Sequence, residues 1–310
     1  MAQDEFIDVN IDFGPEQQPI SEARIREMVT WKPRRMKLAT EWKNALHAPL
    51  GSGQNWSLVL PFPETFRNSF QAMCSGINHY AHVGKDNRCV IFLNDSQWDE
   101  ECVEKAKEWI EAIGKRVAIR DCLAISFALD YRMEGGDPSK SKTVVGDLCR
   151  KAKPYGEDTK YDRDAARQLA RVCVDFLEKV GCYDSADCVA AMPPSRPNKP
   201  FDLPSYLARK VASACGKADL REAIKTKRPR GQLKATSVDE KLNQLRGTIA
   251  IEGNAFKGKN VLVLDDLYQS GTSVNYLGML LLEAGAKRIL SLACEKTVGN
   301  FDNLGSRGGR

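Results

Sequence analysis

The strongest constraint on the fold is a run of four apolar residues that leads directly into two acids near the C-terminus. Residues 261–264 read Val-Leu-Val-Leu, and Asp265 and Asp266 follow them. A continuous apolar run of this length is typical of a strand that is buried on both faces of a parallel sheet. Apolar residues then recur at helical spacing over residues 274–282, and residues 289–294 form a second apolar run. The order strand, helix, strand predicts one βαβ unit.

A short loop of small and polar residues joins the two acids to the helix. Its members are Gln269, Ser270, Gly271, Thr272 and Ser273. In a parallel sheet, ligands bind outside the carboxyl end of a strand, where the N–H groups and the dipole of the following helix favour an anion. We therefore predict that this loop binds a phosphate group, while Asp265 and Asp266 accept hydrogen bonds from sugar hydroxyls, directly or through a metal-bound water. The alternative is an ordinary turn in which the acids cap the helix.

The strand, the acid pair and the loop together resemble the phosphoribosyl-diphosphate (PRPP) signature of type I phosphoribosyltransferases. Neighbouring segments resemble the ComF-like branch of that superfamily, which is similar to the amidophosphoribosyltransferases. They are residues 153–156, 187–194 and 206–212, the pair Gln232 and Asn243, and residues 285–287. The resemblance spans residues 140–300, and it implies a parallel sheet flanked by helices, a dimer, and PRPP or a ribose-5-phosphate-containing nucleotide as ligand.

The resemblance also implies roles for two further segments. The pyrophosphate loop corresponds to Pro193, Pro194, Ser195 and Arg196, and a flexible basic loop that closes over the diphosphate corresponds to Lys225, Lys227, Arg228, Arg230 and Lys234. A solvated basic loop or a contact with nucleic acid are the alternatives for the second segment. The sequence departs from the family at Gln269, where a Thr is usual, and in residues 194–201, which are fewer than in the family.

Two functions from different classes follow. The first is an Mg²⁺-dependent phosphoribosyltransferase in which Asp265 and Asp266 are the catalytic acids and the candidate Mg²⁺ ligands, because Mg²⁺ commonly takes one or two carboxylates and shares its shell with substrate phosphates. Its acceptor is not indicated by the sequence. The second is a sensor or effector subunit that binds PRPP or a nucleotide without turnover, in a nucleic-acid-associated assembly such as DNA uptake or antiviral defence. The shortened residues 194–201 favour the second function.

The chain is expected to be an α/β protein with two folded parts. We predict an N-terminal arm, partly ordered, over residues 1–50, a small α/β domain over 51–133, a linker at 134–142, the phosphoribosyltransferase-like domain over 143–302 and a flexible tail at 303–310. Within the small domain we expect strands at 58–60, 88–93, 117–119 and 123–129 and a helix over 66–80.

The N-terminal half carries two further patterns. Cations and aromatics alternate through Trp31, Lys32, Arg34, Arg35, Lys37, Trp42 and Lys43, which favours either contact with single-stranded nucleic acid or a helix whose Trp residues dock on the core or on a protein partner. The set Cys74, His79, His82 and Cys89 has zinc-ligand chemistry, but the spacing matches no common finger and buried thiols are the alternative.

Composition indicates the charge of suitable ligands and the cellular compartment. The net charge of +5 over 310 residues permits anionic ligands without requiring nucleic acid. The ten Cys show no disulfide spacing, and the first five residues are acidic rather than the start of a secretory signal, so we expect a cytoplasmic protein. No apolar run approaches the ~20 residues of a membrane helix.

Overall fold

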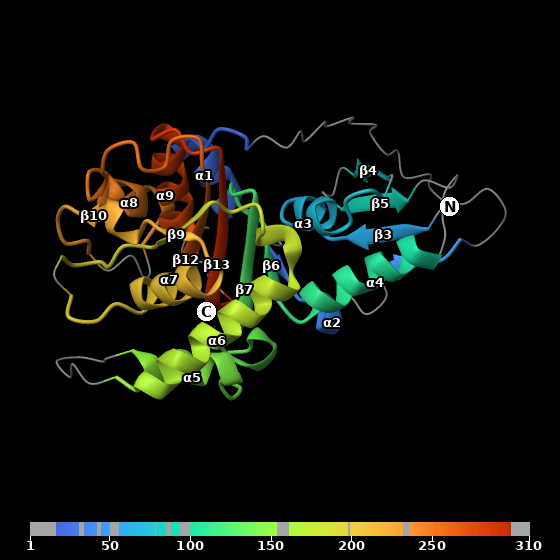
Figure 1. The fold of residues 1–310 in the computed structure, drawn as a ribbon, viewed down its shortest axis with the longest axis horizontal. Helices are drawn as coiled ribbons and strands as arrows, with labels where there is room; N and C mark the ends of the chain where they lie inside the picture. Colours follow the sequence, from blue (N-terminus) through green and yellow to red (C-terminus); the bar gives the residue numbers. More distant parts are fainter. Residues whose placement is uncertain are drawn as a thin grey trace, which may run out of the picture.

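The computed structural model describes residues 17–30, 34–41, 45–49, 56–77, 79–84, 88–93, 100–153, 161–197, 199–231 and 236–298. Its centre is a seven-stranded sheet (Figure 1). In spatial order the strands are β1 (Arg35–Met36), β6 (Val117–Ile119), β7 (Ile125–Tyr131), β13 (Arg288–Lys296), β12 (Asn260–Tyr268), β8 (Cys188–Ala191) and β9 (Ala218–Asp219). The five strands from β7 to β9 are parallel, and β1 and β6 add antiparallel pairs at one edge. The predicted α/β class is confirmed.

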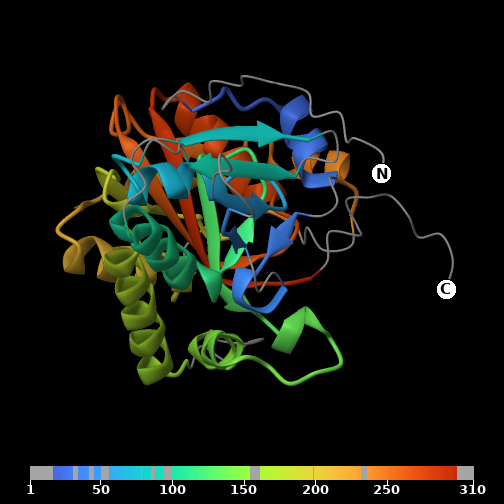
Figure 2. The ribbon, with the colours of Figure 1, turned by 90° about the vertical axis from the view of Figure 1, so that its right-hand side faces the viewer.

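Helices cover both faces of this sheet (Figures 1 and 2). The helices belong to two apolar clusters, one on each face of the sheet. Alternate residues of β12 point into different clusters, because Leu262 and Leu264 belong to one while Val261 and Val263 belong to the other. The first cluster includes α5 (Val144–Ala152), α6 (Arg163–Lys179) and α7 (Leu203–Ala214). The second includes α1 (Glu22–Thr30), α8 (Val238–Leu245) and α9 (Thr272–Glu283). Burial on both faces explains the unbroken apolar run that the sequence shows at 261–264.

A smaller antiparallel sheet lies beside the large one (Figure 1). Its order is β2 (Leu46–His47), β3 (Ser57–Leu60), β5 (Cys89–Leu93) and β4 (His79–Val83), and α2 (Leu38–Glu41), α3 (Phe66–Met73) and α4 (Glu100–Gly114) accompany it. Two further strands, β10 (Ile224–Thr226) and β11 (Ile249–Ile251), form an antiparallel pair on either side of α8 in the sequence. The described residues also form three short 3₁₀ turns: η2 (Glu134–Gly136), η3 (Gly181–Tyr183) and η4 (Arg221–Ala223).

The large sheet draws strands from both sides of the predicted linker at 134–142. Strands β6 and β7 precede that segment, yet β7 pairs with β13 along most of its length. The segment itself is held by a bridge between Met133 and Lys142. It therefore does not separate two sheets, and the small domain expected over 51–133 is limited to the smaller sheet and its helices.

Two local expectations also change. Helix α3 ends at Met73 rather than near residue 80, because Gly76 has a φ of 97° and the chain then enters β4. The expected arm over 1–50 contains the well-packed helix α1, whose Ile25 and Val29 are fully buried in the cluster around α9. Residues 1–16 of that arm, and the tail at 303–310, lie outside the described residues.

Candidate functional site

The crevice between β8 and β12 is where this sheet is expected to bind a ligand. The chain leaves β8 outward through α7 to β9, whereas it leaves β12 in the opposite direction through α9 to β13. Strand order therefore reverses between β8 and β12, and ligands of open α/β sheets bind at the carboxyl ends beside such a switch. Pairing of the two strands ends at Leu264 and Ala191, so the chain segments that follow the two strands separate there.

Asp265 and Asp266 occupy the part of β12 that continues past β8. Their strand still pairs with β13 on its other side as far as Tyr268. Adjacent strand residues point to opposite faces, and their environments differ accordingly. Lys153 Nζ, at the end of α5, lies 3.0 Å from Asp266 Oδ2 and 3.8 Å from Glu295 Oε1. Burial by itself lowers the pKa of Lys153, but the two carboxylates outweigh it and raise that pKa.

Asp265 has no ion pair among the residues that the structure describes. Its side chain keeps some exposed surface, yet protein surrounds most of the carboxylate, and the backbone N–H of Asp266 donates to its Oδ1 at 2.8 Å. Burial, followed by the neighbouring charge of Asp266, raises the pKa of Asp265 to about 8. One acid is therefore paired with a lysine, and the other is a partly buried carboxyl with a raised pKa.

The predicted phosphate loop lies between β12 and α9. Gly271 is left-handed, with a φ of 86°, and it precedes the first residue of α9. Three carbonyl oxygens of the loop accept from side chains of the protein: Lys296 Nζ donates to Gln269 at 2.8 Å, Arg34 Nη1 to Ser270 at 2.7 Å and Asn275 Nδ2 to Gly271 at 2.7 Å. In a trans peptide the following N–H points opposite to the carbonyl. The N–H groups of residues 270–272 are therefore directed away from these three donors, as an anion site requires.

The side chains of this loop are buried or half-buried. Ser270 and Thr272 are buried, with their hydroxyl oxygens 3.4 Å apart, while Gln269 and Ser273 are half-buried. The close approach at Gly271 is to the protein itself, because a Cβ there would lie 2.2 Å from the Tyr268 hydroxyl oxygen and 2.8 Å from Arg34 Nη2. The glycine is needed for packing behind the loop, which the sequence did not indicate.

The predicted pyrophosphate loop and part of the basic loop contact each other. Thr226 Oγ1 donates to the carbonyl oxygen of Pro194 at 2.7 Å, and the Arg230 N–H donates to that of Ser195 at 2.8 Å. Arg230 Nη2 also donates to the carbonyl oxygen of Pro193. The basic loop is thus anchored at Thr226 and Arg230 to the segment that follows β8.

Arg230 lies close enough to the acid pair for the charge of Asp265 to act on its guanidinium. Burial lowers its pKa, and the charges of Asp265 and Asp202 act in the opposite direction. Its Nε is buried and has no hydrogen-bond partner among the described residues. A buried guanidinium donor without an acceptor is a cost that a bound anion would remove.

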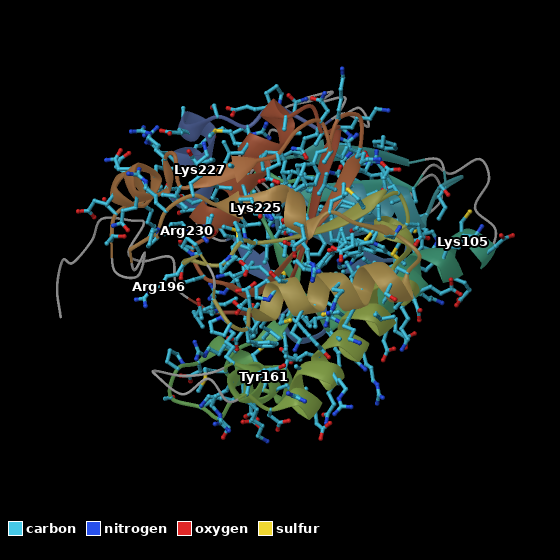
Figure 3. All side chains as sticks on the ribbon, turned by 60° about the vertical axis from the view of Figure 1, so that its left-hand side comes forward. Lys105, Tyr161, Arg196, Lys225, Lys227 and Arg230 are labelled. Atoms are coloured by element: carbon cyan, nitrogen blue, oxygen red, sulfur yellow. The ribbon has the colours of Figure 1, made fainter. Side chains whose placement is uncertain are left out.

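Three other predicted cations, Arg196, Lys225 and Lys227, lie on the same side of the molecule as Arg230 (Figure 3). Lys225, Lys227 and Arg196 are exposed, and Lys225 lies 3.4 Å from the carboxylate of Glu222. Arg228 donates to the carbonyl oxygen of Arg246 at 2.8 Å. Lys234, and Gln232 of the family pattern, lie outside the described residues, while Asn243 lies on α8 and accepts from Arg246 at 2.6 Å.

Sequence reasoning missed the charged residues that end the neighbouring strand. Glu295 and Lys296 follow the apolar run of β13, and Asp130 follows that of β7, in the same way that the acid pair follows 261–264. Glu295 is 2% exposed, and burial raises its pKa even though Lys153 and Arg132 lower it. The rule applied to β12 would have found these residues if it had been applied to every apolar strand.

The structure describes only some residues of the cation–aromatic segment and of the Cys/His set predicted in the N-terminal half. Trp31, Lys32, Trp42 and Lys43 lie outside the described residues, whereas Arg34 is buried beneath the phosphate loop and Lys37 pairs with Asp130 at 2.9 Å. Cys74 and Cys89 are core residues of the smaller sheet. In the described part of the chain, no three His, Cys, Asp or Glu side chains are arranged to hold a metal ion.

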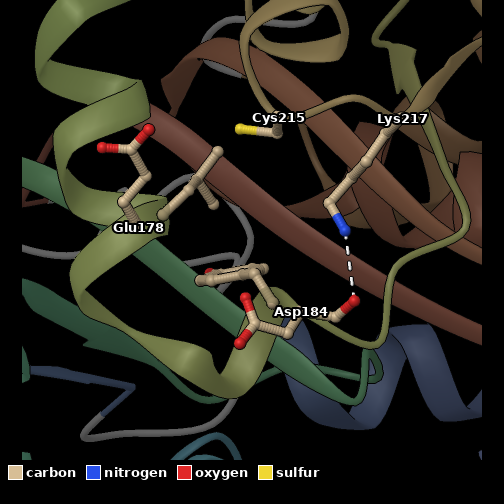
Figure 4. Close-up of a pocket in the computed structure, with 6 residues that line it drawn as sticks. Glu178, Asp184, Cys215 and Lys217 are labelled. Atoms are coloured by element: carbon tan, nitrogen blue, oxygen red, sulfur yellow. Dashed lines mark hydrogen bonds between the residues drawn. The ribbon is translucent and has the colours of Figure 1, made fainter.

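A hollow lies near the amino ends of β8 and β9, where α6 and α7 end. It has a volume of about 210 Å³, and Glu178, Tyr183 and Cys215 are among the residues that line it. Lys217 Nζ spans its rim and donates to the carbonyl oxygen of Asp184 at 3.1 Å (Figure 4). This hollow is remote from the acid pair and contributes nothing to the candidate site.

Comparison with known proteins gives partial structural matches only. No protein-family model and no curated protein sequence matches the chain. A hypoxanthine phosphoribosyltransferase from Staphylococcus aureus aligns over 47% of this chain and 71% of its own, at 9% identity and a TM-score of 0.28. UMP synthase from Leishmania donovani aligns over 64% and 37%, at 16% identity and 0.28. Phosphoribosylpyrophosphate synthetase from Mycobacterium smegmatis aligns over 77% and 79%, at 15% identity and 0.26.

TM-scores of this size carry no argument about function, so a function has to be inferred from the geometry of the site. The described part of the chain contains no helix with the length and apolar character needed to cross a membrane.

Proposed function

We propose that the chain binds PRPP in the crevice between β8 and β12 and transfers its ribosyl phosphate to an acceptor. The observation that supports this most is the convergence of three features at one edge of the sheet. They are the acid pair of β12, the loop whose N–H groups are turned outward before α9, and Arg230 with its unsatisfied Nε beside residues 193–195. Each matches a different part of the ligand, namely sugar hydroxyls, 5′-phosphate and diphosphate.

In the proposed reaction, the bond from C1 of the ribose to the diphosphate breaks and a bond from C1 to the acceptor forms. Positive charge develops on the sugar, and negative charge develops on the leaving diphosphate oxygens. Arg230 is positioned to stabilise the second charge, and Asp265 with Asp266 to orient the sugar through its hydroxyls. The loop at 269–273 would hold the far end of the ligand, so that C1 stays fixed while the diphosphate departs.

The acid pair also suits Mg²⁺ that arrives with the diphosphate. Asp265 offers oxygen ligands and has no cation of its own among the described residues, whereas Lys153 occupies Asp266 at 3.0 Å. Mg²⁺ typically takes one or two carboxylates and completes its shell with water and phosphate oxygens. We propose that Asp265 is the first protein ligand of such an ion, directly or through water, and that the ion would neutralise charge on the diphosphate.

Binding without turnover is the second candidate. The residues after β8 are few, and the carbonyl oxygens of Pro193, Pro194 and Ser195 are already bonded to Arg230 and Thr226. A loop closed on the protein in this way has less freedom to rearrange around a leaving group than an open flap. Under this alternative the chain would act as a PRPP- or nucleotide-binding sensor or effector subunit.

A calorimetric titration with PRPP and Mg²⁺ tests the binding claim. At pH 9, where Asp265 is ionised, wild-type protein should bind, and Asp265→Asn should weaken the affinity at least tenfold, because an amide lacks the charge that attracts both the hydroxyls and the metal. Asp187→Asn, at the amino end of β8 where Asp187 accepts from the Asn260 N–H at 2.7 Å, is the matched control. Equal affinity in Asp265→Asn and wild type would remove the assignment.

Release of pyrophosphate across a panel of bases, nucleotides and amines then separates the two functions. Turnover with any acceptor that is lost in Asp265→Asn establishes the transferase. Tight binding of PRPP with no release across the whole panel establishes the sensor.

A further inference from the structure

The phosphate loop packs on a buried polar network that joins it to residues far away in the sequence. Arg34 is 5% exposed, and its guanidinium donates to three carbonyl oxygens, those of Ser270 at 2.7 Å, Val29 at 3.0 Å and Arg120 at 3.3 Å. Its Nη2 also donates to the hydroxyl oxygen of Tyr268 at 3.0 Å. One arginine therefore ties the loop after β12 to α1 and to the segment after β6.

The network continues from Tyr268 to a buried acid. The Tyr268 hydroxyl donates to Asp121 Oδ2 at 2.9 Å, and the carboxylate of Asp121 also accepts from the Ser126 hydroxyl and from the Leu123 N–H. Asp121 is 1% exposed, and burial raises its pKa even though these donors lower it. Every group of the chain Arg34–Tyr268–Asp121 is thus satisfied within the protein, as buried polar groups must be.

Asn275 closes the network on the helix side. Its Nδ2 donates to the Gly271 carbonyl oxygen at 2.7 Å and reaches the Tyr268 hydroxyl at 3.5 Å, while its Oδ1 accepts from the Cys122 N–H at 2.8 Å. The residue is fully buried in the first turn of α9. Arg34 and Asn275 consequently fix two consecutive peptide planes of the loop from behind.

We infer that Arg34, Tyr268 and Asn275 are positioning residues for the anion site, which hold the loop with its N–H groups facing the ligand. This inference rests on the proposed function, because it assigns the loop to the 5′-phosphate of the ribose. Without the network, the peptides at 270–271 are free to rotate, and the N–H groups lose the common direction on which anion binding depends. Arg34 also places a positive charge beneath the bound phosphate.

Tyr268→Phe is the sharpest test, because it removes one hydroxyl and leaves the ring that packs in the core. The probes are ribose 5-phosphate and inorganic pyrophosphate, each titrated by calorimetry. We expect the Kd for ribose 5-phosphate to rise about tenfold, which corresponds to ~1.4 kcal/mol, and the Kd for pyrophosphate, whose site is formed by Arg230, to stay unchanged. A general loss of stability would weaken both.

Amide hydrogen exchange at residues 270–272 gives a second readout that needs no ligand. It should be at least tenfold faster in Tyr268→Phe and in Arg34→Lys than in wild type. The matched control is Arg35→Met at the next position, since Arg35 donates to the Val298 carbonyl oxygen and not to the loop.

The outcomes separate the two claims. Unchanged ribose 5-phosphate affinity together with unchanged exchange in Tyr268→Phe overturns the positioning role. A wild-type protein that binds neither ribose 5-phosphate nor PRPP overturns the proposed function, and the exchange rates then still decide whether the network holds the loop.

Discussion

Replacement of Asp265 by Asn should stabilise the protein while it removes the proposed ligand contact. Burial and the adjacent Asp266 raise the pKa of Asp265 from 3.8 to about 8. At ~1.36 kcal/mol per pKa unit, this difference corresponds to ~6 kcal/mol for a fully enclosed carboxylate. Because Asp265 keeps part of its surface in water, screening reduces the penalty, and we expect the variant to gain about 2 kcal/mol at pH 8. The Asn can still accept from the Asp266 N–H.

The pH dependence gives this prediction its sign. A group whose pKa is raised on folding contributes stability that is fully present below its unfolded value and is lost as the pH rises through the folded value. For Asp265 the loss runs from about pH 4 to about pH 8. The Asn variant does not titrate, so its advantage over wild type should widen across this window and become constant above it.

Urea denaturation at pH 5, 6.5, 8 and 9 measures the effect. Asp266→Asn is the matched control, because it leaves Lys153 with only the more distant carboxylate of Glu295 at 3.8 Å. It should lower the free energy of unfolding by about 1–2 kcal/mol, after partial relief of the repulsion between the acids. An Asp265→Asn variant that is no more stable than wild type at pH 8, or an advantage that does not change with pH, would refute the reasoning.

Three further predictions concern ligand binding and packing. Arg230→Gln should weaken pyrophosphate binding about tenfold in calorimetry, whereas Arg228→Gln, which loses only a bond to a carbonyl oxygen, should not; equal effects would contradict a specific role for Arg230. PRPP affinity should rise between pH 6.5 and 9 as Asp265 ionises, and a flat profile would argue that its carboxylate does not contact the ligand. Gly271→Ala should lower the free energy of unfolding by about 3 kcal/mol, because its Cβ would lie 2.2 Å from the Tyr268 hydroxyl; a variant as stable as wild type would show that the loop can shift.

The βαβ unit around the acid pair was predictable because its determinants are local. Buried parallel strands consist of apolar runs in the sequence, and the helical spacing of the apolar residues in 274–282 predicts α9. The observed bounds of β12, α9 and β13 confirm the order that 261–264, 274–282 and 289–294 predicted. The switch between β8 and β12, which locates the crevice, follows from strand order and has no local signature.

The role of the N-terminal segment could not be predicted, since it depends on contacts across the whole chain. Arg34 is separated from Ser270 by 236 positions, and nothing near it in sequence distinguishes it from Arg35 and Lys37, which do not reach the loop. The pairing of β7 with β13 could not be predicted either, because the partner of a strand is determined by tertiary packing and not by the residues near it in sequence. These two long-range contacts explain why the large sheet includes strands from both sides of 134–142 and why Arg34, in the arm predicted to be partly ordered, is buried.

The anchoring of Arg230 bears on which of the two functions the site performs. A guanidinium that the carbonyl oxygen of Pro193 already holds loses little conformational freedom when a diphosphate arrives, so binding is favoured. The same fixed position would retain the diphosphate after its bond to the sugar breaks, because the interaction does not weaken as charge builds on the leaving group. Product release should therefore limit any turnover, and a burst of one equivalent of product followed by a slow steady state would show it. A linear time course without a burst would mean that Arg230 moves during the reaction, and that the contacts with residues 193–195 describe a resting arrangement.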